Sequence, residues 1–177
     1  MDRLLRNRVI RYDDIEIYMY GMTHLLAVMS HTIAVVAVGI MLGQLFHGIL
    51  FMVAFAALRT YAGGYHASTP GRCLCLSMGI FTTVLLAMKY LTLSDSVCWG
   101  ILALSGICIL FLSPVEAVNK PLDRVERKIC RRKSIVIWLT ELAATVILMM
   151  TGMKDLAVAI VLANMVTGSS LVIGCWF

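Results

Sequence analysis

The sequence predicts an all-α integral membrane protein with six transmembrane helices and an amphipathic interfacial helix at its N-terminus. Hydrophobic residues make up 60% of the 177 residues and charged residues only 14%, whereas soluble domains average about 45–50% and about 25%. Apolar runs recur at the roughly 17–25 residues that a helix needs to cross a bilayer. Only three prolines and no Ser/Gly-rich stretch interrupt the chain, so we expect a single domain over residues 1–177.

The interfacial helix is expected over residues 1–22. Arginines and acidic residues are mixed here, while Leu5, Val9 and Tyr12 fall near one face at helical spacing, which suits a helix lying among lipid headgroups. No apolar run follows closely enough for a signal peptide. A partly ordered tail is the alternative.

Six apolar runs predict the spans. They cover residues 24–42, 43–59, 74–92, 97–114, 134–151 and 155–173. The connections at 43–44, 89–96 and 152–155 are short, which is typical of antiparallel helical hairpins.

Most Lys and Arg residues lie on one side of these spans. The N-terminus has four arginines, the segment between the second and third spans has Arg59 and Arg72, and the loop 114–133 has seven basic residues. The other side has only Lys89 and Lys154. Because Lys and Arg are enriched in cytoplasmic loops, we expect a multi-pass protein of the cell membrane with both termini and these two segments in the cytoplasm. Basic residues that flank spans form no soluble face, so we expect no nucleic-acid partner.

The cytoplasmic segment 59–73 carries the candidate chemistry. Cys73 lies at the membrane boundary beside Arg72 and seven residues after His66. Positive charge favours the reactive thiolate, and a histidine can take its proton and return it. Seven residues of continuous helix would separate the two by about 10.5 Å, so we expect a turn at 70–71 to bring Cys73 toward His66. The alternatives are an interfacial histidine with an unreactive cysteine, or a metal site; zinc usually takes four ligands, and we expect no metal and no cofactor.

Other residues of this segment are weaker candidates. Arg59 either binds a substrate carboxylate or anchors a helix at the membrane interface. Gly63 and Gly64 either expose backbone N–H groups toward an oxyanion or permit a tight turn. Together with Arg72 they form the group expected to bind the substrate or its oxyanion. Because cytoplasmic cysteines stay reduced, the six cysteines predict no disulfide framework, and we interpret Cys75 as a packing residue.

Among the polar residues inside the spans, four stand out: Ser30, His31, Glu141 and Asn164. An ionisable residue within a span is a functional hypothesis, and His31 and Glu141 lie at similar depths, which would allow them to pair. We interpret the pair as structural. A small transporter or a scaffold for peptide export, without covalent chemistry, is the alternative function, because transporters bring polar groups together near the bilayer midplane.

Two motifs carry a family resemblance. The first reads RTYAGGYHA at 59–67 and is followed by Cys73; the second reads SPVE at 113–116 and is followed by NKPL at 119–122. At these relative positions they are similar to the signatures of the AgrB family of quorum-sensing peptide processors. The resemblance extends over almost the whole chain.

The resemblance implies an activity, a substrate and a partner. Family members cut the C-terminal tail from an AgrD-type precursor peptide; the cysteine that matches Cys73 attacks the scissile carbonyl, and the histidine that matches His66 is its base. A nucleophile of the peptide then attacks the thioester acyl-enzyme and closes a thiolactone, or a lactone if it is a serine. A homodimer is also implied. The residues that would hold an acidic precursor tail are Lys120, Arg131, Arg132 and Lys133; attraction to anionic membrane lipid is the alternative.

Overall fold

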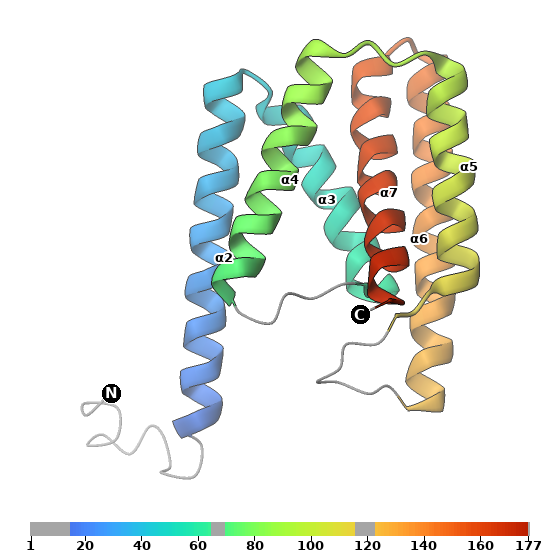
Figure 1. The fold of residues 1–177 in the computed structure, drawn as a ribbon. Helices are drawn as coiled ribbons and strands as arrows, with labels where there is room; N and C mark the ends of the chain where they lie inside the picture. The colour runs from blue at the N-terminus through green and yellow to red at the C-terminus, as the bar shows by residue number, and fades with distance from the viewer. Residues whose placement is uncertain (1–14, 65–69, 116–122, 177) are drawn as a thin grey trace.

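The computed structural model describes residues 15–64, 70–115 and 123–176, and these residues form a bundle of antiparallel helices (Figure 1). The helices are α2 (Ile15–Leu42), α3 (Leu45–Ala62), α4 (Pro70–Tyr90), α5 (Asp95–Leu112), α6 (Arg124–Met150) and α7 (Lys154–Gly174). The all-α prediction is therefore confirmed for the described residues.

Glycines end two of the helices, as the sequence predicts. Gly43 has φ +67°, and the Gln44 amide donates to the Gly39 carbonyl at 2.8 Å, which closes α2 and starts the turn into α3. Gly152 has φ +78° between α6 and α7. A left-handed backbone conformation of this kind is open to glycine at little steric cost.

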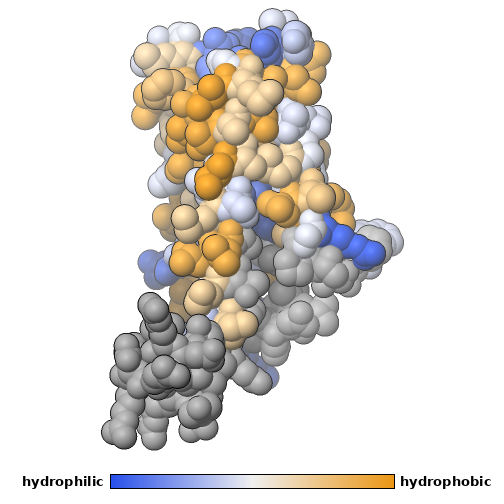
Figure 2. Space-filling view, turned by 90° about the vertical axis from the view of Figure 1, so that its left-hand side faces the viewer, coloured by the Kyte–Doolittle hydropathy of each residue, from blue (hydrophilic) through white to orange (hydrophobic). Residues whose placement is uncertain are grey.

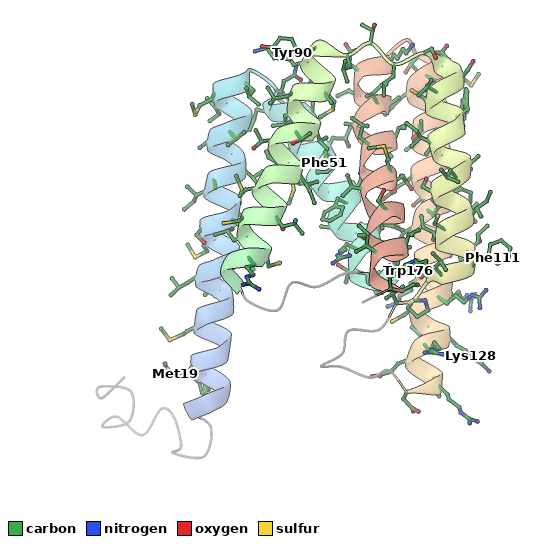
Figure 3. All side chains as sticks on the ribbon, in the orientation of Figure 1. Met19, Phe51, Tyr90, Phe111, Lys128 and Trp176 are labelled. Atoms are coloured by element: carbon green, nitrogen blue, oxygen red, sulfur yellow. The ribbon has the colours of Figure 1, made fainter. Side chains whose placement is uncertain are left out.

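Helix α7 is the centre of the bundle, and it packs on α3, α4, α5 and α6. Every residue from Ala157 to Asn164 on α7 is buried. Alanines at three of these positions let neighbouring helices approach closely. Phe51 of α3 points into this core, whereas Phe111 of α5 points outward (Figure 3).

Helix α2 lies at the edge of the bundle, where it packs on α3 and α4. The face that it forms is largely apolar (Figure 2). Five of the described helices are long and apolar enough to cross a membrane, while α2 contributes a shorter apolar stretch, Val28–Leu42. The predicted count of six spans is therefore not confirmed by the described residues.

The predicted boundary of the interfacial helix at residue 22 is wrong. Residues 15–22 continue without a break into the rest of α2. No proline interrupts this stretch, and Gly21 lies in open space, so nothing ends the helix there. Residues 1–14 lie outside the described part of the chain.

In the described second half of the predicted basic loop 114–133, Arg124 to Lys133 form the first turns of α6. Asp123 and Glu126 form a reciprocal capping box at the start of this helix, which satisfies backbone N–H groups that a helix leaves unpaired. At 27 residues, α6 is about 40 Å long, while the hydrocarbon core of a bilayer is about 30 Å thick. Its basic end therefore extends beyond the ends of α3, α5 and α7 (Figure 1).

The two ends of the bundle differ in charge. Arg59 at the end of α3, Arg72 at the start of α4 and the basic start of α6 lie at one end, which we call the basic end. Lys89 and Lys154 lie at the other end, where Lys154 forms an ion pair with Asp95 of α5.

Candidate active site

The first motif ends helix α3 at the basic end. Gly63 has φ +74°, and its amide donates to the Arg59 carbonyl at 3.1 Å, so it caps the helix. Gly64 follows with φ +120° and is buried. Both glycines therefore hold backbone conformations that other residues rarely adopt.

The second motif lies directly against the first, although about fifty residues separate them in the sequence. The Val115 amide donates to the Ala62 carbonyl at 3.0 Å, and Gly63 and Val115 pair as an isolated parallel bridge. A side chain at Gly63 would overlap the Val115 carbonyl group. Gly63 is required here by close backbone contact as well as by its positive φ.

Arg59 joins this turn to helix α7. Its Nη1 donates to the Gly63 carbonyl at 3.0 Å and to the Ser170 hydroxyl at 2.9 Å. A side chain at Gly64 would overlap the same Arg59 nitrogen and come within 2.8 Å of the Ser170 oxygen. The guanidinium is half-buried and fixes the backbone of the turn, which is a more specific role than an anchor at the membrane interface.

Cys73 lies in the first turn of α4 and is half-buried. The turn expected at 70–71 is instead the start of this helix, because proline is favoured at the first helical position, where its missing N–H is not needed. The N-terminal turn of a helix favours negative charge. Arg59, at the end of α3, and Cys73, at the start of α4, lie at the same basic end of the bundle (Figure 1).

His66 lies outside the described residues, so the distance between His66 and Cys73 stays a prediction. Arg72 is exposed. All six cysteines are free, which agrees with the predicted absence of disulfides. Cys75 is exposed and takes no part in the contacts described above. The interpretation of Cys75 as a packing residue is wrong, because its side chain faces out of the bundle.

The basic residues at the start of α6 point in different directions. Arg131 donates from Nη2 to the Leu110 carbonyl at 3.0 Å near the end of α5, whereas the Lys133 ammonium lies 4.7 Å from the centre of the Tyr61 ring on α3. A shallow groove of about 530 Å³ lies between α3 and α6. We call it the α3/α6 groove, and its lining residues are Tyr61, Ile129, Arg132, Lys133, Val136 and Ile137. Of the four residues predicted to hold a precursor tail, Arg132 and Lys133 share this groove, Arg131 does not line it, and Lys120 lies outside the described residues.

The polar residues inside the bundle pair differently from the prediction. Asn164 donates to the Glu141 carboxylate at 2.8 Å and to the Ile160 carbonyl at 3.0 Å, and both side chains are buried. Glu141 therefore joins α6 to α7, and His31 on α2 is not its partner. Because α2 packs on α3 and α4, the three residues do not form the common polar site that the transporter alternative requires.

Sequence reasoning missed two contributors to this region. Ser170 on α7 belongs to no recognised motif. The only sequence signal for it is its position among small polar residues near the end of an apolar span. The Val115 backbone was recognised within a motif, but nothing in the sequence indicated its contact with Gly63. Both contacts depend on helices that are distant in the sequence.

Comparison with known proteins agrees with these motifs. The family model described as AgrB, accessory gene regulator B, matches residues 1–173. No curated protein and no solved structure matches the chain. The AgrB family acts with the AgrD precursor peptide in quorum sensing, and the apolar helices are those of a multi-pass membrane protein. The chain therefore belongs to the AgrB family and takes part in processing a quorum-sensing peptide.

Proposed function

We propose that the chain is a membrane cysteine endopeptidase and peptide cyclase, built as one domain over residues 1–177. It removes the C-terminal tail of an AgrD-type precursor and closes the remaining peptide to a thiolactone or lactone. Cys73 is the nucleophile and His66 is its base. The observation that carries this proposal is the position of Cys73 in the first turn of α4, at the end of the bundle where Arg59 holds the turn that closes α3.

The first step forms an acyl-enzyme. The Cys73 sulfur attacks the scissile carbonyl after His66 takes its proton, and the negative charge on sulfur is stabilised by the helix terminus and the guanidinium. The carbon–nitrogen bond then breaks, and the protonated His66 returns its proton to the amine of the departing tail. The peptide stays attached to Cys73 as a thioester.

The second step closes the ring. A thiol or hydroxyl of the bound peptide gives its proton to His66, attacks the thioester carbonyl and displaces the Cys73 thiolate, which takes the proton back from His66. Exchange between two thioesters is close to thermoneutral, so tail release or product removal must drive the reaction forward. Water competes with the peptide nucleophile, and a site at the membrane boundary limits that competition.

The glycines have different roles in this proposal. The Gly63 amide already donates to the Arg59 carbonyl, so it is not available to an oxyanion, and the expectation that both glycines donate is not supported. The Gly64 amide is the remaining oxyanion donor of the pair. Arg59 acts by holding the turn and by its charge, and Arg72 supplies a second positive charge beside Cys73.

The α3/α6 groove is the proposed site for the precursor tail. Arg132 and Lys133 give it positive charge beside an apolar floor, which suits an acidic peptide segment at a membrane surface. The same charges attract anionic lipid. A homodimer stays a prediction of the family resemblance.

The basic end is proposed to face the cytoplasm, together with both termini and Cys73. The clustering of Arg59, Arg72 and the α6 arginines at one end supports this orientation, because basic residues are enriched on the cytoplasmic side of membrane proteins. A precursor made in the cytoplasm would then reach the site directly.

Substitution of the nucleophile tests the proposal. Cys73→Ala and His66→Ala should each abolish tail release in membranes that contain the cognate AgrD-type precursor, while membrane insertion is unchanged. Cys75→Ala is the matched control, because Cys75 lies two residues along the same helix and is exposed; it should keep most of the activity. Wild-type cleavage by Cys73→Ala would end the protease proposal.

A further inference from the structure

A serine of the last helix contacts the turn that precedes the catalytic residues. The Ser170 hydroxyl accepts a hydrogen bond from Arg59 Nη1 at 2.9 Å and donates its own proton to the Thr167 carbonyl at 2.8 Å. Both hydrogen-bonding directions of this hydroxyl are therefore used. Because the Thr167 carbonyl takes the hydroxyl hydrogen, the oxygen lone pairs face the guanidinium.

The same guanidinium nitrogen contacts the catalytic turn. Arg59 Nη1 donates to the Gly63 carbonyl at 3.0 Å, and the Gly64 backbone lies directly on Ser170. Ser170 is thus the fixed point on α7 that orients the Arg59 side chain, and Arg59 in turn holds the Gly63 carbonyl. We call these three groups the Arg59 clamp.

We propose that Ser170 is a positioning residue for the AgrB reaction, acting through Arg59 on the turn at Gly63 and Gly64. This inference rests on the proposed function. Helix α7 is the most buried helix of the bundle, so it offers a rigid support for a turn that lies at the membrane boundary. A support of this kind acts on the rate of the chemical step more than on substrate affinity.

The neighbouring Ser169 provides a matched control. Its hydroxyl also donates to a carbonyl of its own helix, that of Met165 at 2.8 Å, but its side chain is exposed. Ser169→Ala therefore removes the same chemical group and the same type of helix contact without touching Arg59.

The experiment compares kcat and KM for tail release from the cognate AgrD-type precursor by the full-length protein in membranes. Ser170→Ala should lower kcat about tenfold or more, because hydrogen bonds to charged groups are among the stronger ones, with KM changed less than about threefold. Ser169→Ala should behave as wild type. In an Arg59→Gln background, Ser170→Ala should have less than about a twofold further effect, because residues that act as a unit are not additive.

Threonine and valine at position 170 separate the hydroxyl from the shape of the side chain. The two have nearly the same shape, but only Ser170→Thr keeps an acceptor for Arg59. Activity of Ser170→Thr at least tenfold above that of Ser170→Val supports the clamp, and this comparison holds even if Ser170→Ala does not insert. Equal activity of these two variants, or equal activity of Ser170→Ala and Ser169→Ala, overturns the inference. If Cys73→Ala cleaves normally, the proposed function itself fails; if Cys73→Ala is inactive while Ser170→Ala equals Ser169→Ala, only the clamp fails.

Discussion

Gly63→Ala tests whether the contact between the two motifs is needed for activity. The added methyl would overlap the Val115 carbonyl group, and the residue has φ +74°. Left-handed backbone costs a non-glycine residue about 1–2 kcal/mol, and loss of the hydrogen bond from Val115 to Ala62 costs about 0.5–1.5 kcal/mol. The sum is about 1.5–3.5 kcal/mol, which corresponds to a factor of about 10–400 in the equilibrium constant for the native turn.

We therefore expect Gly63→Ala to release the precursor tail about 10–400 times more slowly than wild type. The assay is the initial rate of tail release in membranes, normalised to inserted protein. Gly79→Ala is the matched control, because Gly79 lies on α4 with open space around it, and its rate should stay within about twofold of wild type. A Gly63→Ala rate above half of the wild-type rate would refute the argument that backbone contact between the motifs holds the site.

Three further predictions concern charge, the bundle interior and orientation. Replacing Arg132 and Lys133 by Gln should weaken precursor binding about tenfold at low salt and less at high salt. The same change at the exposed residues Arg124 and Lys128, outside the groove, should have little effect. Equal losses of affinity from both pairs in a binding titration would point to nonspecific attraction. Glu141→Ala should lower the free energy of unfolding in detergent by about 1–3 kcal/mol, since it removes the acceptor of one buried Asn164 N–H. Glu141→Gln should stay within about 1 kcal/mol of wild type because it keeps an acceptor. An unchanged stability in Glu141→Ala would contradict the pairing. Impermeant maleimide applied to intact cells should label neither Cys73 nor Cys130, and both should react once the membrane is opened; labelling from outside would invert the proposed orientation.

Much of the fold follows from local sequence signals. The turn at Gly43 and the turn at Gly152 are predicted because glycine ends helices at positive φ. The start of α6 is a local signal that was overlooked, since an acidic cap followed three residues later by Glu126 marks a helix start. A segment rich in Arg and Lys was interpreted as a loop because its charge excludes it from the membrane, but charge does not prevent helix formation beyond the bilayer.

The arrangement of the site depends on packing that no local signal contains. The motifs make Arg59, Gly63 and Cys73 candidate functional residues, but the partners Val115 and Ser170 become visible only when α5 and α7 are packed against α3. The pairing of Glu141 was predicted wrongly for the same reason. Depth in the membrane allows a pairing with His31, whereas helix order in the bundle selects Asn164.

The central claim is that Cys73 carries the peptide as a thioester before the ring closes, and intact-protein mass spectrometry tests it most directly. Full-length protein in membranes is given a precursor whose internal nucleophile is replaced by Ala, so that cleavage can occur but cyclisation cannot. With this precursor, we expect the tail to be released and the chain to gain the mass of the remaining peptide on Cys73, and hydroxylamine should remove this mass. Wild-type precursor should give little adduct and a product one water lighter than the linear acid. Failure of tail release without the peptide's own nucleophile would contradict the account, because that nucleophile would then attack first and Cys73 would not be the acyl carrier.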